Sequence, residues 1–151
     1  MELSQQQLRS KALAMLTRRE HSQYELQHKL AELGASTSQI QLILQEFSQQ
    51  GWQSESRFCE ALIRSLVNKG QGELVIRQEL KQRGVTDKNL FDDLLQEYDW
   101  FALAQQVRAK KFGSALPLPT DKKEQARQCR FLQYRGFNSE QCWYAVKTDM
   151  D

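Results

Sequence analysis

The sequence predicts an all-α protein made of three tandem three-helix repeats, and three observations support this fold class. Only seven glycines and two prolines occur in 151 residues, whereas glutamine, leucine, glutamate, lysine and arginine are abundant, a composition typical of helices. Apolar residues recur at helical spacing, as in Ile40, Ile43, Leu44 and Phe47. The chain also resembles itself at intervals of about fifty residues, which indicates repeats.

The repeats become visible when the chain is slid along itself. A shift of 50 residues places Gly34 on Gly84, a further shift of 52 carries Gly84 to Gly136, and the apolar phase is kept throughout. We expect three-helix repeats, each similar to a helix-turn-helix unit, at residues 1–52, 53–100 and 101–151. The third repeat has a longer loop at 112–121, "FGSALPLPTD", between its first and second helices.

Helix starts and helix ends have local chemical causes. Ser22 and Glu25 form the pattern of a capping box, so a second helix should begin near residue 22. Gly34, Gly84 and Gly136 stand where a helix must end in a left-handed turn. The stretch around Gly136, "QYRGFNSEQC", is therefore predicted to be a helix end, a turn closed by Phe137 and a new helix start. Thr86 or Asp87, Asn138 or Ser139, and Ser36 to Ser38 offer side-chain oxygens for the third helices.

Charge is unevenly distributed along the chain. The third repeat carries nine basic and five acidic side chains, whereas the second carries seven basic and nine acidic ones. Sequence-specific reading of a duplex is disfavoured because of the expected third helices, which would have to enter the groove. In the first repeat this helix, "TSQIQLILQEFSQQ", has no basic residue, and in the second repeat it, "DKNLFDDLLQEY", is strongly acidic. Non-specific contact with a single strand through the third repeat remains open.

Other functional classes find little support in the residues. No nucleotide-binding loop, nucleophile elbow or H-E-x-x-H motif is present, so we expect no catalytic site and no cofactor. His21 and His28 are expected to be exposed rather than metal ligands, and the three cysteines to be buried core residues.

No apolar run could span a bilayer and no basic leader precedes an apolar core, so a cytoplasmic location is expected. No sustained heptad seam is seen, so a monomer is expected.

Three segments in order resemble the RecX family of regulatory proteins, which modulate the recombinase RecA. They are "SQYELQHKL", "SRFCEALIRSLVNKGQGELVIRQELKQRGV" and "RQCRFLQYRGF", and the resemblance covers residues 10 to 146. It implies an elongated, curved array of repeats that binds the RecA filament on single-stranded DNA. It further implies that binding lowers the ATPase, strand-exchange and co-protease activities of RecA, and so regulates recombination, DNA repair and the SOS response.

On this resemblance, the acidic second repeat would lie against protein. The basic side chains of the third repeat would face phosphate or an acidic strip of RecA; they are Lys110, Lys111, Lys122, Lys123, Arg127, Arg130 and Arg135. The alternative is a helix-turn-helix DNA-binding transcriptional regulator, which would prefer one duplex sequence and dimerise.

Overall fold

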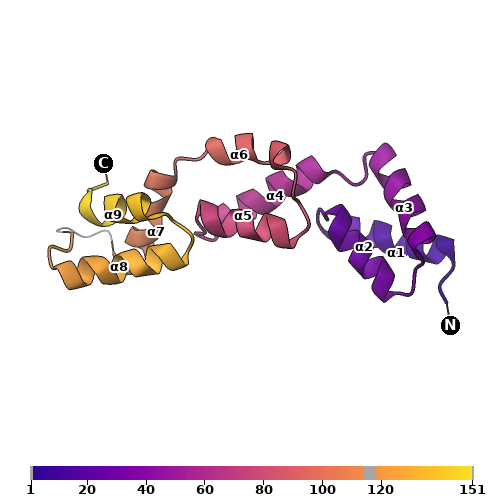
Figure 1. The fold of residues 1–151 in the computed structure, drawn as a ribbon, viewed down its shortest axis with the longest axis horizontal. Helices are drawn as coiled ribbons and strands as arrows, with labels where there is room; N and C mark the ends of the chain where they lie inside the picture. Colours follow the sequence, from indigo (N-terminus) through magenta and orange to yellow (C-terminus); the bar gives the residue numbers. More distant parts are fainter. Residues whose placement is uncertain (1, 114–117, 151) are drawn as a thin grey trace. The chain divides into compact units, whose positions relative to one another are not determined.

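The computed structural model describes residues 2–113 and 118–150, and all regular secondary structure in these residues is helical. Figure 1 shows the elements, which are α1 (Gln5–Arg18), α2 (Gln23–Glu32), α3 (Thr37–Gln49), α4 (Glu55–Asn68), α5 (Glu73–Gln82), a 3-10 turn η1 (Lys88–Leu90), α6 (Asp92–Gln96), α7 (Trp100–Phe112), α8 (Lys122–Tyr134) and α9 (Ser139–Lys147). The all-α class predicted from the sequence is confirmed.

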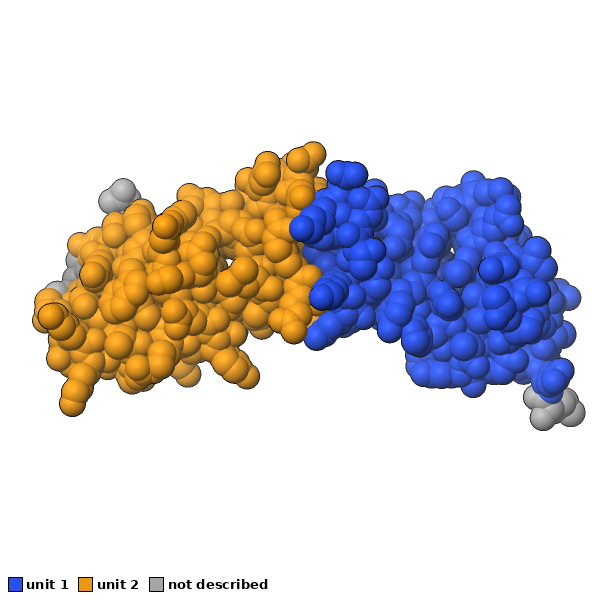
Figure 2. Space-filling view, viewed as in Figure 1, with its two compact units in different colours: residues 1–62, 80–91 blue, residues 63–79, 92–151 orange. Residues whose placement is uncertain are grey.

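The chain divides into two compact units, drawn in blue and orange in Figure 2. Unit 1 comprises residues 1–62 and 80–91, and unit 2 comprises residues 63–79 and 92–151. Two of the boundaries fall inside α4 and α5 and the third lies directly before α6, so the second repeat contributes residues to both units. The repeat limits at residues 52 and 100 stay a prediction.

Short polar side chains begin most of the helices. Ser22 Oγ accepts a hydrogen bond from the Glu25 amide at 3.1 Å, and the Glu25 carboxylate accepts one from the Ser22 amide at 3.1 Å. Ser36 and Asn138 form capping boxes at α3 and α9, and Ser4 forms one at α1 that the sequence reading did not single out. The helix starts are therefore encoded locally, because each cap satisfies amides that have no partner inside the helix.

The corner after α8 ends the helix with a Schellman turn. Gly136 has φ 104°, its amide donates to the carbonyl of Gln133 at 3.0 Å, and the Phe137 amide donates to the carbonyl of Leu132 at 3.1 Å. Phe137 is buried, so it packs back as such a turn requires. The corners after α2 and α5 repeat these two hydrogen bonds at Gly34 and Gly84.

In unit 1, the corner after α5 contacts the start of α2. Ser22 Oγ donates to the carbonyl of Arg83 at 2.7 Å, and the Arg83 guanidinium lies 2.7 Å from the Glu25 carboxylate. A Cβ atom at Gly84 would overlap the side chain of Tyr24. The corner that ends α5 thus packs against the Ser22–Glu25 capping box at the start of α2.

In unit 2, the corner after α8 contacts the start of α5 in the equivalent way. The amides of Gly72 and Leu74 donate to the carbonyls of Arg135 and Gly136 at 2.7 and 3.0 Å. A Cβ atom at Gly136 would lie 2.7 to 2.8 Å from Val75. Gly72 occupies the position that Ser22 has in the first repeat. At the start of α2 the Ser22 side chain accepts a hydrogen bond from a backbone amide, whereas at the start of α5 the carbonyls of the corner after α8 are the acceptors.

Each unit has its own buried apolar side chains. The core of unit 1 contains Leu8, Ala12, Leu30, Ile40, Ile43 and Phe47. In unit 2, α9 packs on α7 and α8 and buries Cys142, Ala145 and Val146. Cys59, Cys129 and Cys142 are free and buried, as expected, and burial raises the pKa of Cys59 to about 11 and that of Cys142 to about 12.

The expected exposure of His21 is wrong, whereas His28 is exposed as expected. His21 is only 8% exposed and precedes α2 instead of lying on it. Its ring Nδ1 donates to the carbonyl of Arg19 at 3.0 Å, and Gln53 Nε2 donates to the His21 carbonyl at 3.2 Å. The ring is buried because the turn before the Ser22 cap folds it inward. Desolvation lowers the pKa of His21 below its ordinary value of 6.5.

The third helix of the second repeat is broken, unlike the continuous helix expected over "DKNLFDDLLQEY". Asp87 caps the turn η1 by accepting from the Asn89 amide at 3.0 Å, and Phe91 then leaves helical geometry with φ −139°. The helix α6 that follows has five residues, and the indole of Trp100 donates to its carbonyl at Leu95 at 3.0 Å. The helix is therefore short because η1 and Phe91 precede it and because the Trp100 indole takes up the Leu95 carbonyl near its C-terminus.

The loop predicted at 112–121 is described only in part. Phe112 is the last residue of α7 and Asp121 caps α8 by accepting from the Glu124 amide at 3.3 Å. Gln125 Nε2 donates to the carbonyl of Pro119 at 2.9 Å. Residues 114–117 lie outside the described residues.

Substituting alanine for Gly136 should destabilise the protein more than the same change at Gly34. Both glycines have positive φ, 104° and 92°, but a Cβ at Gly34 has no neighbour within 4 Å whereas one at Gly136 would overlap Val75. Urea unfolding followed by circular dichroism should show a loss of about 1 kcal/mol for Gly34→Ala and about 3 kcal/mol for Gly136→Ala. Equal losses would show that the close approach to Val75 has no energetic weight.

Stability should depend on the protonation of His21. Because its pKa is lower in the folded than in the unfolded chain, its contribution is complete above pH 6.5 and is lost as the pH falls below 6.5 towards the folded value. The free energy of unfolding measured between pH 7 and pH 5 should decrease. His21→Asn should flatten this dependence, and the exposed control His28→Asn should keep it.

Candidate functional site

The seven basic residues predicted to meet a partner lie on two helices and one corner of unit 2. Lys110 and Lys111 lie in the last turn of α7, and Arg135 caps the C-terminus of α8. The other four lie on α8 and are Lys122, Lys123, Arg127 and Arg130. The structure separates these residues by what each side chain contacts.

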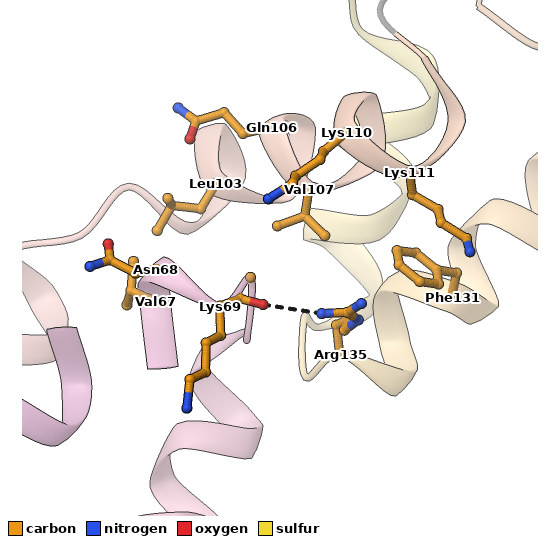
Figure 3. Close-up of a pocket in the computed structure, with 11 residues that line it drawn as sticks. Val67, Asn68, Lys69, Leu103, Gln106, Val107, Lys110, Lys111, Phe131 and Arg135 are labelled. Atoms are coloured by element: carbon orange, nitrogen blue, oxygen red, sulfur yellow. Dashed lines mark hydrogen bonds between the residues drawn. The ribbon is translucent and has the colours of Figure 1, made fainter. Parts of the chain in front are cut away.

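Three of the seven residues, Lys110, Lys111 and Arg135, line an open cleft of about 520 Å³. Figure 3 shows that the cleft lies between the end of α4, α7 and the end of α8. Lys69, which follows α4, adds a fourth basic residue. Sequence reasoning missed Lys69, because nothing local connects the second repeat to a residue 66 positions further along the chain.

The floor of the cleft is apolar. Val67, Leu103 and Val107 contribute aliphatic side chains, and Phe131 contributes one aromatic ring. Asn68 and Gln106, both exposed, also line it and offer amide groups. No carboxylate is among the described residues that line the cleft. The cleft therefore combines apolar surface, hydrogen-bonding amides and positive charge.

Arg135 already has contacts within the chain. Its guanidinium donates to the carbonyl of Lys69 at 3.1 Å and lies 5.0 Å from the centre of the Phe131 ring. Lys69 follows the last residue of α4, where free carbonyls and the helix dipole favour a cation. The arginine in "QYRGF" thus links the third repeat to the end of α4 instead of presenting an unengaged charge.

Arg127 is also engaged within the chain. Its guanidinium forms two hydrogen bonds with the Glu124 carboxylate, at 2.6 and 2.9 Å, and lies 5.0 Å from the centre of the Phe112 ring. The Arg127 guanidinium and the side-chain amide of Gln128 hold the pKa of Glu124 at about 2. Glu124 therefore stays ionised at physiological pH, and its charge offsets that of Arg127.

The remaining three residues, Lys122, Lys123 and Arg130, are exposed on α8 and do not line the cleft. Within the part of the chain that the structure describes, no ion pair or hydrogen bond engages their side chains. They form a second basic surface, which we call the outer α8 surface.

Arg108 is a buried cation that sequence reasoning left out of the site. It is 6% exposed, its Nε donates to Gln128 Oε1 at 2.8 Å, and desolvation lowers its pKa. The sequence did contain a signal, because Arg108 follows Trp100 and Ala104 at helical spacing on the buried side of α7. Its role is to support α8 from inside the third repeat.

The described residues contain no group of three or more histidine, cysteine, aspartate or glutamate side chains arranged to hold a metal ion. No described helix is long and apolar enough to cross a membrane.

Family models match this chain in three consecutive segments. The first, second and third three-helix domains of RecX match residues 9–47, 54–89 and 97–146. The chain belongs to the RecX family of regulatory proteins. The three-repeat organisation predicted from the sequence is confirmed by these matches in their order.

Relatives named regulatory protein RecX extend over most of this RecX chain. The protein from Halorhodospira halophila is 43% identical over 136 residues, 89% of this chain and 83% of the relative. The protein from Vibrio cholerae strain O395 is 40% identical over 140 residues, 92% of this chain and 91% of the relative. The crystal structure of RecX from Lactobacillus salivarius has a TM-score of 0.78 at 18% identity and covers 95% of this chain and 94% of its own, so it supports the fold.

Replacing Arg135 should cost stability, whereas replacing Arg130 should not. Arg135→Gln removes the bond to the Lys69 carbonyl and the contact with Phe131, and should lower the free energy of unfolding by about 1 kcal/mol. Arg130→Gln removes an exposed charge near the same helix end and should change it by less than about 0.5 kcal/mol. Urea unfolding measures both, and equal effects would remove the structural role of Arg135.

Proposed function

We propose that this RecX chain binds the RecA filament on single-stranded DNA and lowers the activities of RecA. Its target activities are ATP hydrolysis, strand exchange and co-protease function, so it regulates recombination, DNA repair and the SOS response. The observation that carries the proposal is the ordered match of three RecX domains. Family membership also favours a regulator over an enzyme. We further propose that the protein acts in the cytoplasm as a monomer.

The outer α8 surface is the proposed contact with phosphate. Lys122, Lys123 and Arg130 are exposed, and no described residue neutralises them. Lysine and arginine side chains that meet phosphates release counterions, which favours binding without any reading of base sequence. This suits a partner in which the nucleic acid is a single strand held by protein.

A transcriptional regulator that reads a duplex is not favoured. Its recognition helix would have to enter the major groove and present basic or amide side chains to base edges. In the second repeat, the third helix is the five-residue α6, which begins with Asp92 and Asp93. A short acidic helix would be repelled by the phosphates on both sides of the groove.

The decisive experiment adds the protein to RecA assembled on single-stranded DNA and follows ATP hydrolysis together with filament length. Both should decrease at substoichiometric amounts of the added protein. Unchanged hydrolysis and length at one added protein for every few RecA subunits would overturn the proposal.

Binding of the protein to single-stranded DNA alone should weaken with salt in proportion to the phosphates contacted. Three contacts on the outer α8 surface predict a slope of log affinity against log salt of about −2. A triple variant, Lys122→Gln, Lys123→Gln and Arg130→Gln, should bring this slope close to zero. Fluorescence anisotropy of a labelled oligonucleotide measures it, and an unchanged slope would place the phosphate contacts elsewhere.

A further inference from the structure

The cleft between α4, α7 and α8 differs chemically from the outer α8 surface. Lys69, Lys110 and Lys111 stand around an aliphatic floor made by Val67, Leu103 and Val107. A surface that meets only phosphate gains nothing from such a floor, because a phosphate group has no apolar part to bury. The floor therefore indicates a ligand that carries apolar groups as well as negative charge.

Nucleobases are a poor match for the apolar part of this cleft. Single-stranded nucleic acid is bound by stacking bases on aromatic rings, and Phe131 is the one aromatic ring among the described lining residues. That ring already has Arg135 at 5.0 Å, Lys111 at 5.6 Å and the ring of Phe112 at 5.3 Å from its centre. A stacked base would have to displace these contacts, whereas a branched aliphatic side chain fits beside valine and leucine without doing so.

The polar groups match a polypeptide. Lys69 and Lys110 have exposed ammonium groups that no described residue pairs, and carboxylates are the complementary charge. Asn68 and Gln106 each offer a donor and an acceptor, which is what the amide and carbonyl of a peptide backbone require. A volume of about 520 Å³ accommodates a few side chains, so the ligand is a short segment and not a folded domain.

We propose that this cleft binds an acidic segment of a partner protein, with an aliphatic side chain seated on Val67, Leu103 and Val107 and carboxylates beside Lys69, Lys110 and Lys111. The inference rests on the proposed function only for the source of that segment, since the chemistry of the cleft defines the ligand by itself. The cleft and the outer α8 surface then have separate ligands, peptide and phosphate.

The test uses the full chain and a short fluorescein-labelled peptide in which leucines alternate with aspartates, and follows fluorescence anisotropy. The double variant Lys110→Gln and Lys111→Gln should weaken peptide binding by about three- to tenfold. The matched control, Lys122→Gln and Lys123→Gln, removes the same charge from the same repeat outside the cleft and should leave peptide binding within about twofold. Binding of a labelled thymidine oligonucleotide should be weakened by the Lys122→Gln, Lys123→Gln variant and left unchanged by the Lys110→Gln, Lys111→Gln variant.

A second variant tests the apolar floor. Val107→Thr keeps the shape of the side chain but places a hydroxyl in the floor, so it should weaken the leucine peptide by about threefold and leave a peptide with alanine in place of leucine unchanged. If the double lysine variant loses its helical circular dichroism, Lys69→Gln replaces it, because that change leaves α7 intact.

Three outcomes would overturn the proposal. They are peptide binding that ignores both the lysine and the valine variants, an oligonucleotide that depends on Lys110 and Lys111 in place of the peptide, and self-association of the chain through the cleft in sedimentation experiments. Inhibition of RecA with no peptide binding would remove the cleft assignment alone, and peptide binding without inhibition of RecA would remove the proposed function alone.

Discussion

The contact between an arginine-glycine corner and the start of an earlier helix is the constraint on which each unit depends. In unit 2 the carbonyls of Arg135 and Gly136 accept from the amides of Gly72, just before α5, and of Leu74 in its first turn, so a helix end and a helix start satisfy one another. Both groups would otherwise be left without partners as the surfaces come together, and that carries a desolvation cost. The glycine is needed twice, once for its positive φ and once because a Cβ would strike Val75.

The same constraint explains why the three corner sequences differ. Gly84 and Gly136 each follow an arginine, and each approaches the side chain of the helix it contacts. Gly34 follows Leu33, and no described atom lies within 4 Å of where its Cβ would be. The corner after α2 therefore has the same Schellman turn, but its glycine does not pack against the start of another helix. At this corner the glycine is needed only for its backbone conformation, and there is no contact of the kind that Arg83 and Arg135 make at the other two corners.

The sequence predicted the features whose causes are local. Ser22 with Glu25, and Gly136 with Phe137, act within a few residues of one another, so caps and turns can be recognised from spacing alone. Long-range contacts decided the remainder. Lys69 belongs to the cleft because α4 ends beside α8, and His21 is buried because the turn before α2 folds inward. Neither arrangement leaves a trace in periodicity or composition.

The seven basic residues show why net charge is a weak guide to a binding site. From the sequence, all seven were expected to face phosphate or an acidic strip of RecA, but a cation contributes to a partner only if its charge is not already compensated. Glu124 compensates Arg127, and the end of α4 together with Phe131 holds Arg135. Lys110 and Lys111 stand above apolar surface, whereas Lys122, Lys123 and Arg130 do not line the cleft. The apolar surroundings of a charge, more than the charge itself, decide whether a carboxylate on an aliphatic peptide or a hydrated phosphate is the better ligand.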